Sequence, residues 1–283
     1  MRILIATDDS PHAQAVLHLA AYLLQGHLAD EPPVLLTVVR READRPRAEA
    51  VLARARESLR VAGVQTRLRI GWPAREIVRE ANEGYYGLVV VGEGWRPNGL
   101  VARRLKVTTA LRVAEQALCP VLIAKGRIGP IRRILLCDSG AKVVVEGQRA
   151  GPSLLSRFTA QLAELLGGEE LVTVLHVMSQ ISAGPGVRGR QLRADVEELM
   201  QEHTPEGKLL EYDLRVLQRP GIHPQPKVRH GLVVDEIADE ARSGDYDLVV
   251  IGAHPGRGWR HLLLEDLARE IILRLDRPVL VVR

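Results

Sequence analysis

Two glycine-bearing loops carry the residue types in this sequence that suggest ligand chemistry. One follows the apolar run at residues 88–91 and begins at Gly92, and the other follows residues 248–251 and begins at Gly252. A glycine loop that leads from a buried strand into a helix can present backbone N–H groups to a phosphate. The first loop could also be a plain strand-to-helix turn, and Glu93 and Val107 favour that interpretation.

Acidic and hydroxyl residues follow two further apolar runs. Thr7 and Asp8 come after the first run of the chain, and Asp138 follows a similar run near its middle. Asp8 could position a ribose or a metal ion, or it could be a turn and capping residue, and the sequence leaves both open. Because the sequence pairs no nucleophile with a base and no two carboxylates at catalytic spacing, we predict no catalytic residues. The scattered histidines predict no metal site.

The position of the glycines argues against two common nucleotide-binding motifs. A dinucleotide fingerprint should follow the first strand of the fold, whereas these glycines follow the fourth predicted strand. The GxxxxGK[ST] pattern of a P-loop does not occur in the sequence. We therefore expect neither an NAD site nor a P-loop.

Short apolar runs alternate with helical patterns along the whole chain. Such alternation predicts an α/β fold with a parallel sheet that helices cover on both faces. In the first half, the predicted strands are residues 3–7, 34–39, 64–70, 88–91 and 121–124. Ligands of open parallel sheets bind outside the carboxyl ends of the strands. The loops after the first and the fourth predicted strands of each half should therefore meet at one edge of the sheet.

The second half of the chain repeats the first. Gly71, Glu76, Glu80 and Tyr86 each have an identical residue 160 positions later, and the run at residues 87–92 recurs as residues 247–252. The starts of the halves correspond at an offset of 131, so the second copy carries 29 extra residues before its fourth strand. We predict two domains of one type.

The predicted domains are residues 1–126 and residues 131–283, joined by a segment with two glycines and a proline. In the second domain, two stretches are predicted to be loop insertions, residues 140–152 and residues 218–227. The latter holds three prolines, which favour a surface excursion. The position of the third strand of this domain within residues 209–230 stays open.

Composition excludes several classes of protein. Hydrophobic residues make up 46% of the chain, which excludes a disordered protein. The net charge of +4 is spread out and aromatics are only 3%, so nucleic acid is not an expected partner. No apolar run is long enough to span a membrane, and the N-terminus lacks a signal-peptide pattern, so we expect a cytoplasmic protein. Cys119 and Cys137 are interpreted as buried free thiols.

An ordered set of motifs, found twice, resembles the universal stress protein domain. In the first copy it comprises residues 6–10 after strand one, Gly71 with Pro73 and Ile77, residues 88–92, and residues 119–123. The second copy has the corresponding residues 231–237, 247–252 and 277–281. The resemblance implies two Rossmann-like, adenine nucleotide alpha-hydrolase-like sheets of five parallel strands in the order 3-2-1-4-5. It also implies pairing of the domains through their last strands, about a pseudo-twofold axis, and leaves room for a homodimer.

ATP-binding members of that family carry Gly-x2-Gly-x9-Gly-[Ser/Thr] after strand four, and this chain departs from the pattern in both copies. In the second copy, Pro255 falls at the second glycine, and Glu265 and Asp266 stand at the Gly-Ser pair. In the first copy, Trp95 falls at the second glycine and Val107 precedes Thr108. Carboxylates there would repel a triphosphate, and proline donates no N–H group.

The resemblance nevertheless carries over a set of candidate nucleotide-contacting residues. They are Thr7, Asp8, Val38, Gly92, Gly94, Thr108 and Thr109 in the first copy, and Asp138, Val177, Gly252 and Gly256 in the second. We expect a non-catalytic stress-response protein that acts through an unidentified protein partner, with ATP hydrolysis weak at most. The alternative is a stress-signalling switch that binds one ATP or AMP, with Mg²⁺, in the first copy.

Overall fold

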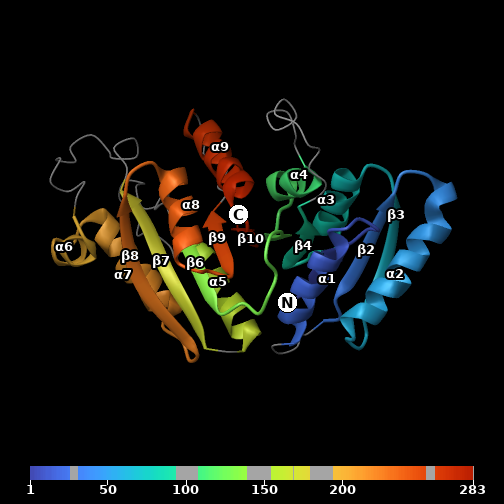
Figure 1. Cartoon of the computed structure of the whole chain (residues 1–283), viewed down its shortest axis with the longest axis horizontal. Coiled ribbons are helices and arrows are strands. Elements are labelled where there is room, and N and C mark those ends of the chain that lie inside the picture. Colours follow the sequence, from blue (N-terminus) through green and yellow to red (C-terminus); the bar gives the residue numbers. More distant parts are fainter. Residues whose placement is uncertain are drawn as a thin grey trace. The chain divides into compact units, whose positions relative to one another are not determined.

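The computed structural model describes residues 1–25, 31–93, 108–138, 154–167, 169–178, 194–252 and 259–282, with the side chains of the last segment described from residue 267. By its contacts the chain divides into two compact units (Figure 1). The first unit contains residues 1–130 and 276–281, and the second contains residues 131–275 and 282.

The first unit is a parallel sheet with helices on both faces. Its strands lie in the order β3-β2-β1-β4-β5, as the resemblance implies. The strands are β1 (Ile3–Ala6), β2 (Val34–Val39), β3 (Gln65–Ile70), β4 (Leu88–Gly92) and β5 (Val121–Ala124). The helices are α1 (Ala13–Gln25), the 3-10 turn η1 (Glu42–Asp44), α2 (Arg45–Leu59), α3 (Pro73–Glu83) and α4 (Thr109–Gln116). Helix α1 packs beside α2, and α3 packs beside α4.

The second unit has the same arrangement for its first four strands, in the order β8-β7-β6-β9. These strands are β6 (Arg133–Cys137), β7 (Glu170–Met178), β8 (Ile222–His230) and β9 (Leu248–Gly252), and β10 (Val279–Val282) ends the chain. The helices are α5 (Leu154–Leu166), α6 (Val196–Gln201), α7 (Pro205–Leu217), α8 (Val233–Ser243) and α9 (Trp259–Arg274). The predicted α/β fold with mostly parallel strands is therefore confirmed.

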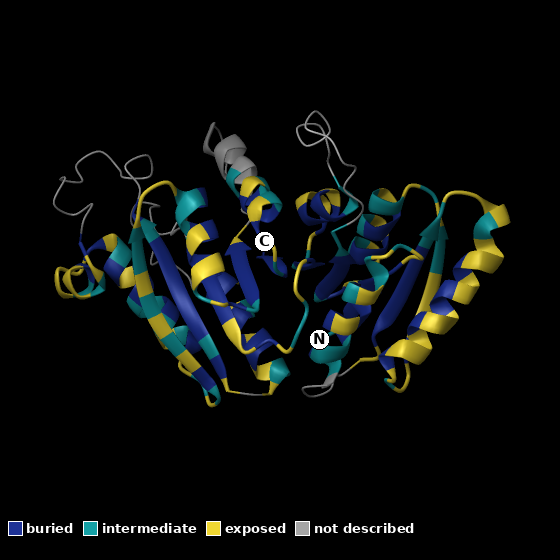
Figure 2. Cartoon of the chain, viewed as in Figure 1, coloured by how far each residue is buried: buried dark blue, intermediate teal, exposed yellow. Residues whose placement is uncertain are grey.

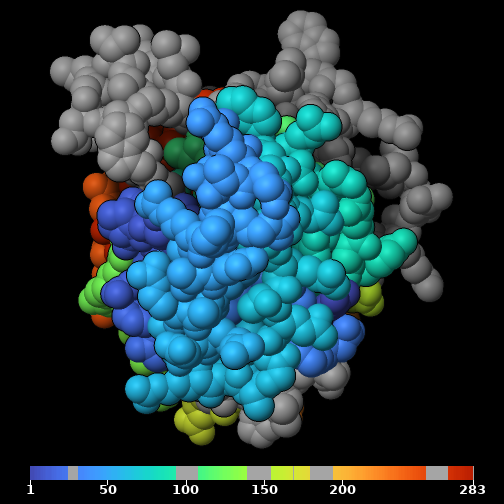
Figure 3. Space-filling model, turned by 90° about the vertical axis from the view of Figure 1, so that its right-hand side faces the viewer, coloured from blue at the N-terminus to red at the C-terminus, as the bar shows by residue number. Residues whose placement is uncertain are grey.

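Continuous Val, Leu and Ile runs form the buried centre of each sheet (Figure 2). All four residues of β1 are buried, and the register places Ile5 between Leu35 of β2 and Val90 of β4. Strands that are covered on both faces need apolar side chains on both sides, which explains why these runs do not alternate with polar residues. Strand β3 lies at the edge, where the side chains are exposed or half-buried (Figure 3 views this side of the first unit).

The prediction that residues 218–227 form a loop insertion is wrong for most of that stretch. Residues from Ile222 onward belong to β8, which is the edge strand beside β7. The N–H of Gly231 donates to the carbonyl of Met178, so odd-numbered residues of this strand point their N–H groups toward β7. Pro224 and Pro226 are even-numbered, and their missing N–H groups would have faced away from β7. An edge strand therefore tolerates both prolines.

Helix α7 was also missed at the level of sequence. The sequence leaves the third strand of the second copy open within residues 209–230, and the first part of that stretch is the end of α7. Thr204 caps this helix, because its hydroxyl accepts a hydrogen bond of 3.0 Å from the Gly207 N–H, and Pro205 occupies the first turn. The other predicted insertion, residues 140–152, lies outside the described residues.

The two last strands pair antiparallel, as expected. Val279, Leu280 and Val281 of β10 stand opposite Ile123, Leu122 and Val121 of β5. By sequence β10 is the last strand of the second copy, but residues 276–281 belong by their contacts to the first unit.

Two smaller observations bear on the sequence predictions. Both cysteines are free thiols, although only Cys137 is fully buried, and burial raises the pKa of Cys119 to about 11. In the described part of the chain, no helix combines the length and the apolar character needed to cross a membrane.

Candidate functional site

The carboxyl ends of the central strands gather most of the candidate residues of the first unit. Thr7 follows β1, Val38 lies near the end of β2, and Gly92 is the last residue of β4. Because β1, β2 and β4 are parallel neighbours, these three residues share one edge of the sheet. Ligand sites of open α/β sheets lie at this edge.

Thr7 and Asp8 are held by local hydrogen bonds. The Thr7 N–H donates to the Leu36 carbonyl at 2.9 Å, and the Thr37 hydroxyl donates to the Thr7 carbonyl at 3.0 Å. The Thr7 hydroxyl itself is buried and has no hydrogen-bond partner. The Asp8 carboxylate accepts a hydrogen bond of 3.0 Å from the Ser10 N–H, so in this structure it serves the turn before α1.

Gly92 has a packing role in addition to its position at the edge. A Cβ atom on this residue would lie 3.1 Å from the side chain of Val16 in α1, closer than most real contacts. The glycine therefore lets α1 approach the end of β4. Val38 is half-buried on β2, beside the fully buried Thr37.

Thr108 caps α4, and Thr109 is the first residue of that helix. The Thr108 hydroxyl accepts a hydrogen bond of 3.2 Å from the Leu111 N–H, which is the usual N-cap geometry. Gly94, Trp95 and Val107, which belong to the same loop, lie outside the described residues.

A buried ion pair lies at the same edge of the first unit. Lys125, directly after β5, places its ammonium group 2.9 Å from the Glu93 carboxylate, directly after β4. The lysine side chain is 1% exposed and the glutamate 16%. Each charge offsets part of the solvation that the other loses on burial. The charge of Lys125 is thus balanced from within the protein.

The second unit places titratable residues where the first has small neutral ones. Asp138 follows β6 as Thr7 follows β1, and the strand registers align His176 of β7 with Thr37 of β2. The His176 Nδ1 atom lies 3.3 Å from the Asp138 carbonyl, which matches the bond between Thr37 and Thr7. Burial lowers the pKa of His176, so its imidazole is neutral at pH 7.

A third titratable residue, Asp213 of α7, completes this cluster. Asp213 is fully buried, and neither oxygen of its carboxyl group has a partner at hydrogen-bond geometry, although Asp138 and Ser156 lie next to it. Burial, followed by the charge of Asp138, raises the pKa of Asp213 to about 8. At neutral pH this carboxyl group therefore carries a proton.

The remaining candidates of the second unit are less informative. Val177 is half-buried on β7, and Gly252 ends β9, where a Cβ atom would meet only ordinary contacts at 3.9 Å. Gly256 and Pro255 lie outside the described residues, as do the side chains of Glu265 and Asp266. Groups of three or more His, Cys, Asp or Glu side chains that could hold a metal ion do not occur among the described residues.

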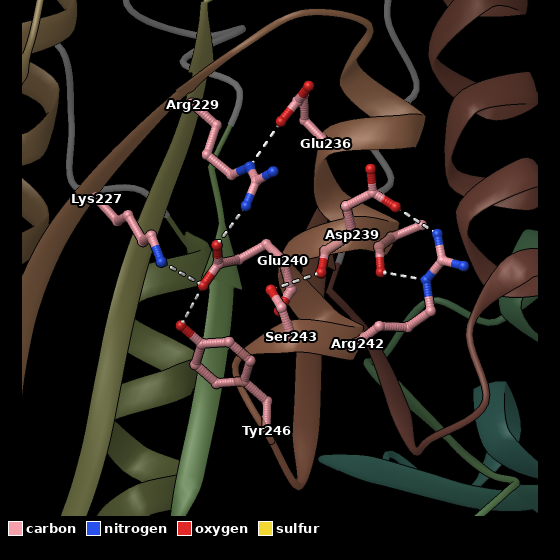
Figure 4. Close-up of polar contacts among 9 residues, drawn as sticks. Lys227, Arg229, Glu236, Asp239, Glu240, Arg242, Ser243 and Tyr246 are labelled. Atoms are coloured by element: carbon pink, nitrogen blue, oxygen red, sulfur yellow. Dashed lines mark hydrogen bonds and ion pairs between the residues drawn. The ribbon is translucent and has the colours of Figure 1, made fainter.

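Both units also contain an equivalent buried polar network away from the strand ends. In the second unit, the Glu240 carboxylate accepts hydrogen bonds of 2.8–2.9 Å from Lys227, Arg229 and Tyr246 (Figure 4). In the first unit, Glu80 accepts from Arg69 at 2.6 Å and from Tyr86 at 2.9 Å. These networks link the edge strand, the helix after it and the start of the next strand, which is a structural role.

Three residues of the site were not identified from the sequence. Lys125 directly follows the predicted strand at residues 121–124, and this position could have indicated that it lies at the ligand-binding edge. His176 is the residue before the candidate Val177, but its partner Asp138 is distant in sequence. Asp213 could not be found, because the helix that carries it was not predicted.

Comparisons with known proteins give the family. The sequence profile described as "Universal stress protein family" matches residues 1–125 and 143–283. No curated protein matches the chain. Among solved structures, a universal stress protein from Archaeoglobus fulgidus covers 100% of this chain and 96% of its own, with 16% identity and a TM-score of 0.67. One from Pseudomonas aeruginosa, described as a putative universal stress protein, covers 99% of this chain and 92% of its own, with 17% identity and the same TM-score.

The structural likeness shows the fold, because the identities are low. The family match spans most of the chain in two segments, which agrees with the internal repeat and with the two units of the structure. On this basis the chain belongs to the universal stress protein family, with two domains of that family in tandem.

Proposed function

We propose that this chain is a non-catalytic stress-response protein in which neither strand edge binds a nucleoside triphosphate tightly. The observation that carries the proposal is the buried pair of Glu93 and Lys125. Lys125 is the cation nearest in sequence to the end of β5, and Glu93 already balances its charge. A phosphate group would compete with Glu93 for the ammonium group and would meet the repulsion of its carboxylate.

The second unit supports the proposal in a different way. Asp138 and Asp213 bring two carboxyl groups to the edge where the first unit has Thr7 and an alanine, Ala55. Any ionisation of this pair makes the edge more negative, which disfavours a polyphosphate. His176 does not offset this charge, because its pKa is lowered by burial.

Exposed apolar residues at matching positions support action through a protein partner. Trp72 of the first unit is 63% exposed and Leu232 of the second is 57% exposed, and each precedes the first residue of its helix, α3 or α8. The guanidinium of Arg40 stacks on the Trp72 ring at 3.5 Å. Tryptophan and arginine are enriched at protein interfaces.

Calorimetric titration of the full chain with Mg-ATP and with AMP tests the proposal. We expect dissociation constants above the micromolar range for both nucleotides, because Glu93 already balances the buried cation that the structure describes at the edge of the first unit. Submicromolar binding of ATP would refute the proposal.

The matched variant is Glu93→Gln, which keeps the size of the side chain and removes its charge. It removes the carboxylate that lies 2.9 Å from the Lys125 ammonium group, so we expect phosphate-bearing ligands to bind about tenfold more tightly than to the unmodified chain. Lys125→Met, which removes the cation, should not show this gain.

A second function, a switch that binds one adenine nucleotide in the first unit, is favoured by one observation. Thr108 caps α4 with its hydroxyl, and a helix N-terminus can receive a phosphate. This function predicts that Thr108→Val weakens AMP binding, whereas Thr108→Ser preserves it. Equal affinity of both variants and the unmodified chain would exclude this role for Thr108.

A further inference from the structure

Helix α7 of the second unit contains one buried residue, Asp213, that packing alone does not explain. Helix α2 packs against β2 and β3, and α7 packs against the equivalent strands β7 and β8. Both helices end in a buried leucine, Leu59 and Leu217. Four residues before that leucine, α2 has Ala55 and α7 has Asp213, and both are buried. A carboxyl group has thus replaced a methyl group on the sheet-facing side of the helix.

A buried carboxyl group at this point lowers the stability of the fold. Burial without a hydrogen-bond partner is unfavourable for a neutral polar group and more so for a charge. The apolar Ala55 shows that the fold does not need a polar group here. Asp213 also has companions that can titrate, so the cost coincides with a cluster of groups that exchange protons.

The polar groups near Asp213 come from several elements of the second unit. Asp138 approaches from the end of β6 and Ser156 from α5. His176, which contacts Asp138, approaches from β7, and Glu206 of the first turn of α7 lies near His176. None of these described groups is a lysine or arginine that could balance an ionised Asp213.

We propose that the cluster of Asp138, His176 and Asp213 is a proton-linked switch in the second unit, which holds α7 against the sheet while Asp213 is uncharged and loosens it when Asp213 ionises. The proton goes to solvent, and the negative charge that it leaves is buried beside Asp138. The first unit, with Thr7, Thr37 and Ala55 at these places, lacks the switch.

The direction of the effect follows from linkage. The folded chain holds the Asp213 proton up to a pH of about 8, whereas an unfolded aspartate releases it near its ordinary pKa of 3.8. The folded state therefore binds more protons than the unfolded state across this window, and stability of the second unit falls as the pH rises through it. Below the window, both states are protonated and the effect is absent.

Hydrogen exchange of the unmodified chain, followed by mass spectrometry at several pH values, tests the switch. After correction for the intrinsic exchange rate, we expect the protection of α7 amides to fall about tenfold between pH 6.5 and pH 9, relative to α2 amides in the same sample. Helix α2 is the internal control, because Ala55 cannot ionise. A parallel change of α2 and α7 would overturn the proposal.

Two variants make the test independent of other groups that titrate. Asp213→Asn retains the shape but cannot ionise, and Asp213→Ala restores the residue of the first unit. Both should abolish the pH-dependent loss of α7 protection, and their melting temperature should exceed that of the unmodified chain at pH 9 by more than at pH 6. The exposed control Asp239→Asn should leave the pH dependence intact. If Asp213→Asn keeps the full pH dependence, the switch does not reside in this carboxyl group.

Discussion

At the scale of single residues, the two units differ most where their chemistry could lie and agree most where they carry the fold. Gly71 and Gly231 have φ angles of 152° and 151°, and a Cβ atom at either one would collide with the following helix's Glu76 or Glu236. The same repeat that keeps these glycines has changed Thr7 to Asp138 and Thr37 to His176. The two units thus share the glycines that the fold requires, but they differ in the residues at the carboxyl ends of the strands.

The polar network around Glu240 gives a prediction at this scale. Glu240→Ala should lower the free energy of unfolding by about 3–5 kcal/mol, because it leaves Lys227, Arg229 and Tyr246 without their shared acceptor. Urea unfolding at pH 7 measures this loss. Asp239→Asn on the same helix is the control and should cost less than about 0.5 kcal/mol. A loss as small as that of the control would contradict the structural role of the network.

The same residue predicts an acid dependence. Burial alone would raise the pKa of Glu240, but hydrogen bonds from Lys227, Tyr246 and Arg229 lower it below the ordinary value of 4.5. A depressed pKa contributes stability above pH 4.5 that is lost as the pH falls through the folded value. In urea unfolding between pH 7 and pH 3, the unmodified chain should therefore lose more stability than Glu240→Gln. An equal loss in both chains would contradict this sign.

Residue patterns predicted the strand-edge glycines and Asp8, but not the pairing of distant charges. Lys125 and Glu93 meet because β4 and β5 are neighbours, and the order of strands came from a resemblance rather than from either residue. Asp213 meets Asp138 across 75 positions of sequence that include an unpredicted helix. Tertiary pairings of this kind leave no local signal.

At the scale of elements, β8 shows how prolines mislead a prediction from sequence alone. Three prolines in residues 218–227 indicated a surface loop, but only the N–H groups that face β7 matter for pairing. The positions of the buried strands along the chain were predicted well, because continuous Val, Ile and Leu runs have few other uses in an α/β fold.

Two single substitutions in β8 test this account of the strand. Gln225→Pro should lower the free energy of unfolding by about 3 kcal/mol, since the N–H of residue 225 faces β7 and would be lost. Pro226→Ala should change it by less than about 1 kcal/mol, because the N–H that it adds points away from β7. Thermal or urea unfolding compares them, and equal effects would show that the phase of the strand has been misassigned.

At the scale of the whole molecule, the C-terminal strand joins the end of the chain to the first unit. The three paired residues of β10 are each no more than 2% exposed, and they cover β5 along its length. The sequence predicted this pairing through the family resemblance. Composition and periodicity alone could not have predicted it, because they indicate the strands within each copy but not which strands of the two copies pair.

Removal of residues 276–283 tests the role of β10. The truncated chain should lose hydrogen-exchange protection at β5, because the amide and carbonyl groups on one side of that strand lose their partners. Protection at β2, on the other side of the first unit, is the internal comparison and should fall less. Unchanged protection of β5 would mean that β10 does not stabilise the first unit.

The most direct test of the proposed function counts bound nucleotide on the intact chain. Equilibrium dialysis against about 10 μM Mg-ATP at pH 7.5 gives the number of nucleotides bound per chain. We expect about 0.1 nucleotide per chain or less, because Glu93 balances Lys125 in the first unit and the second unit has buried carboxyl groups at its edge. A value near one or two nucleotides per chain would contradict the account.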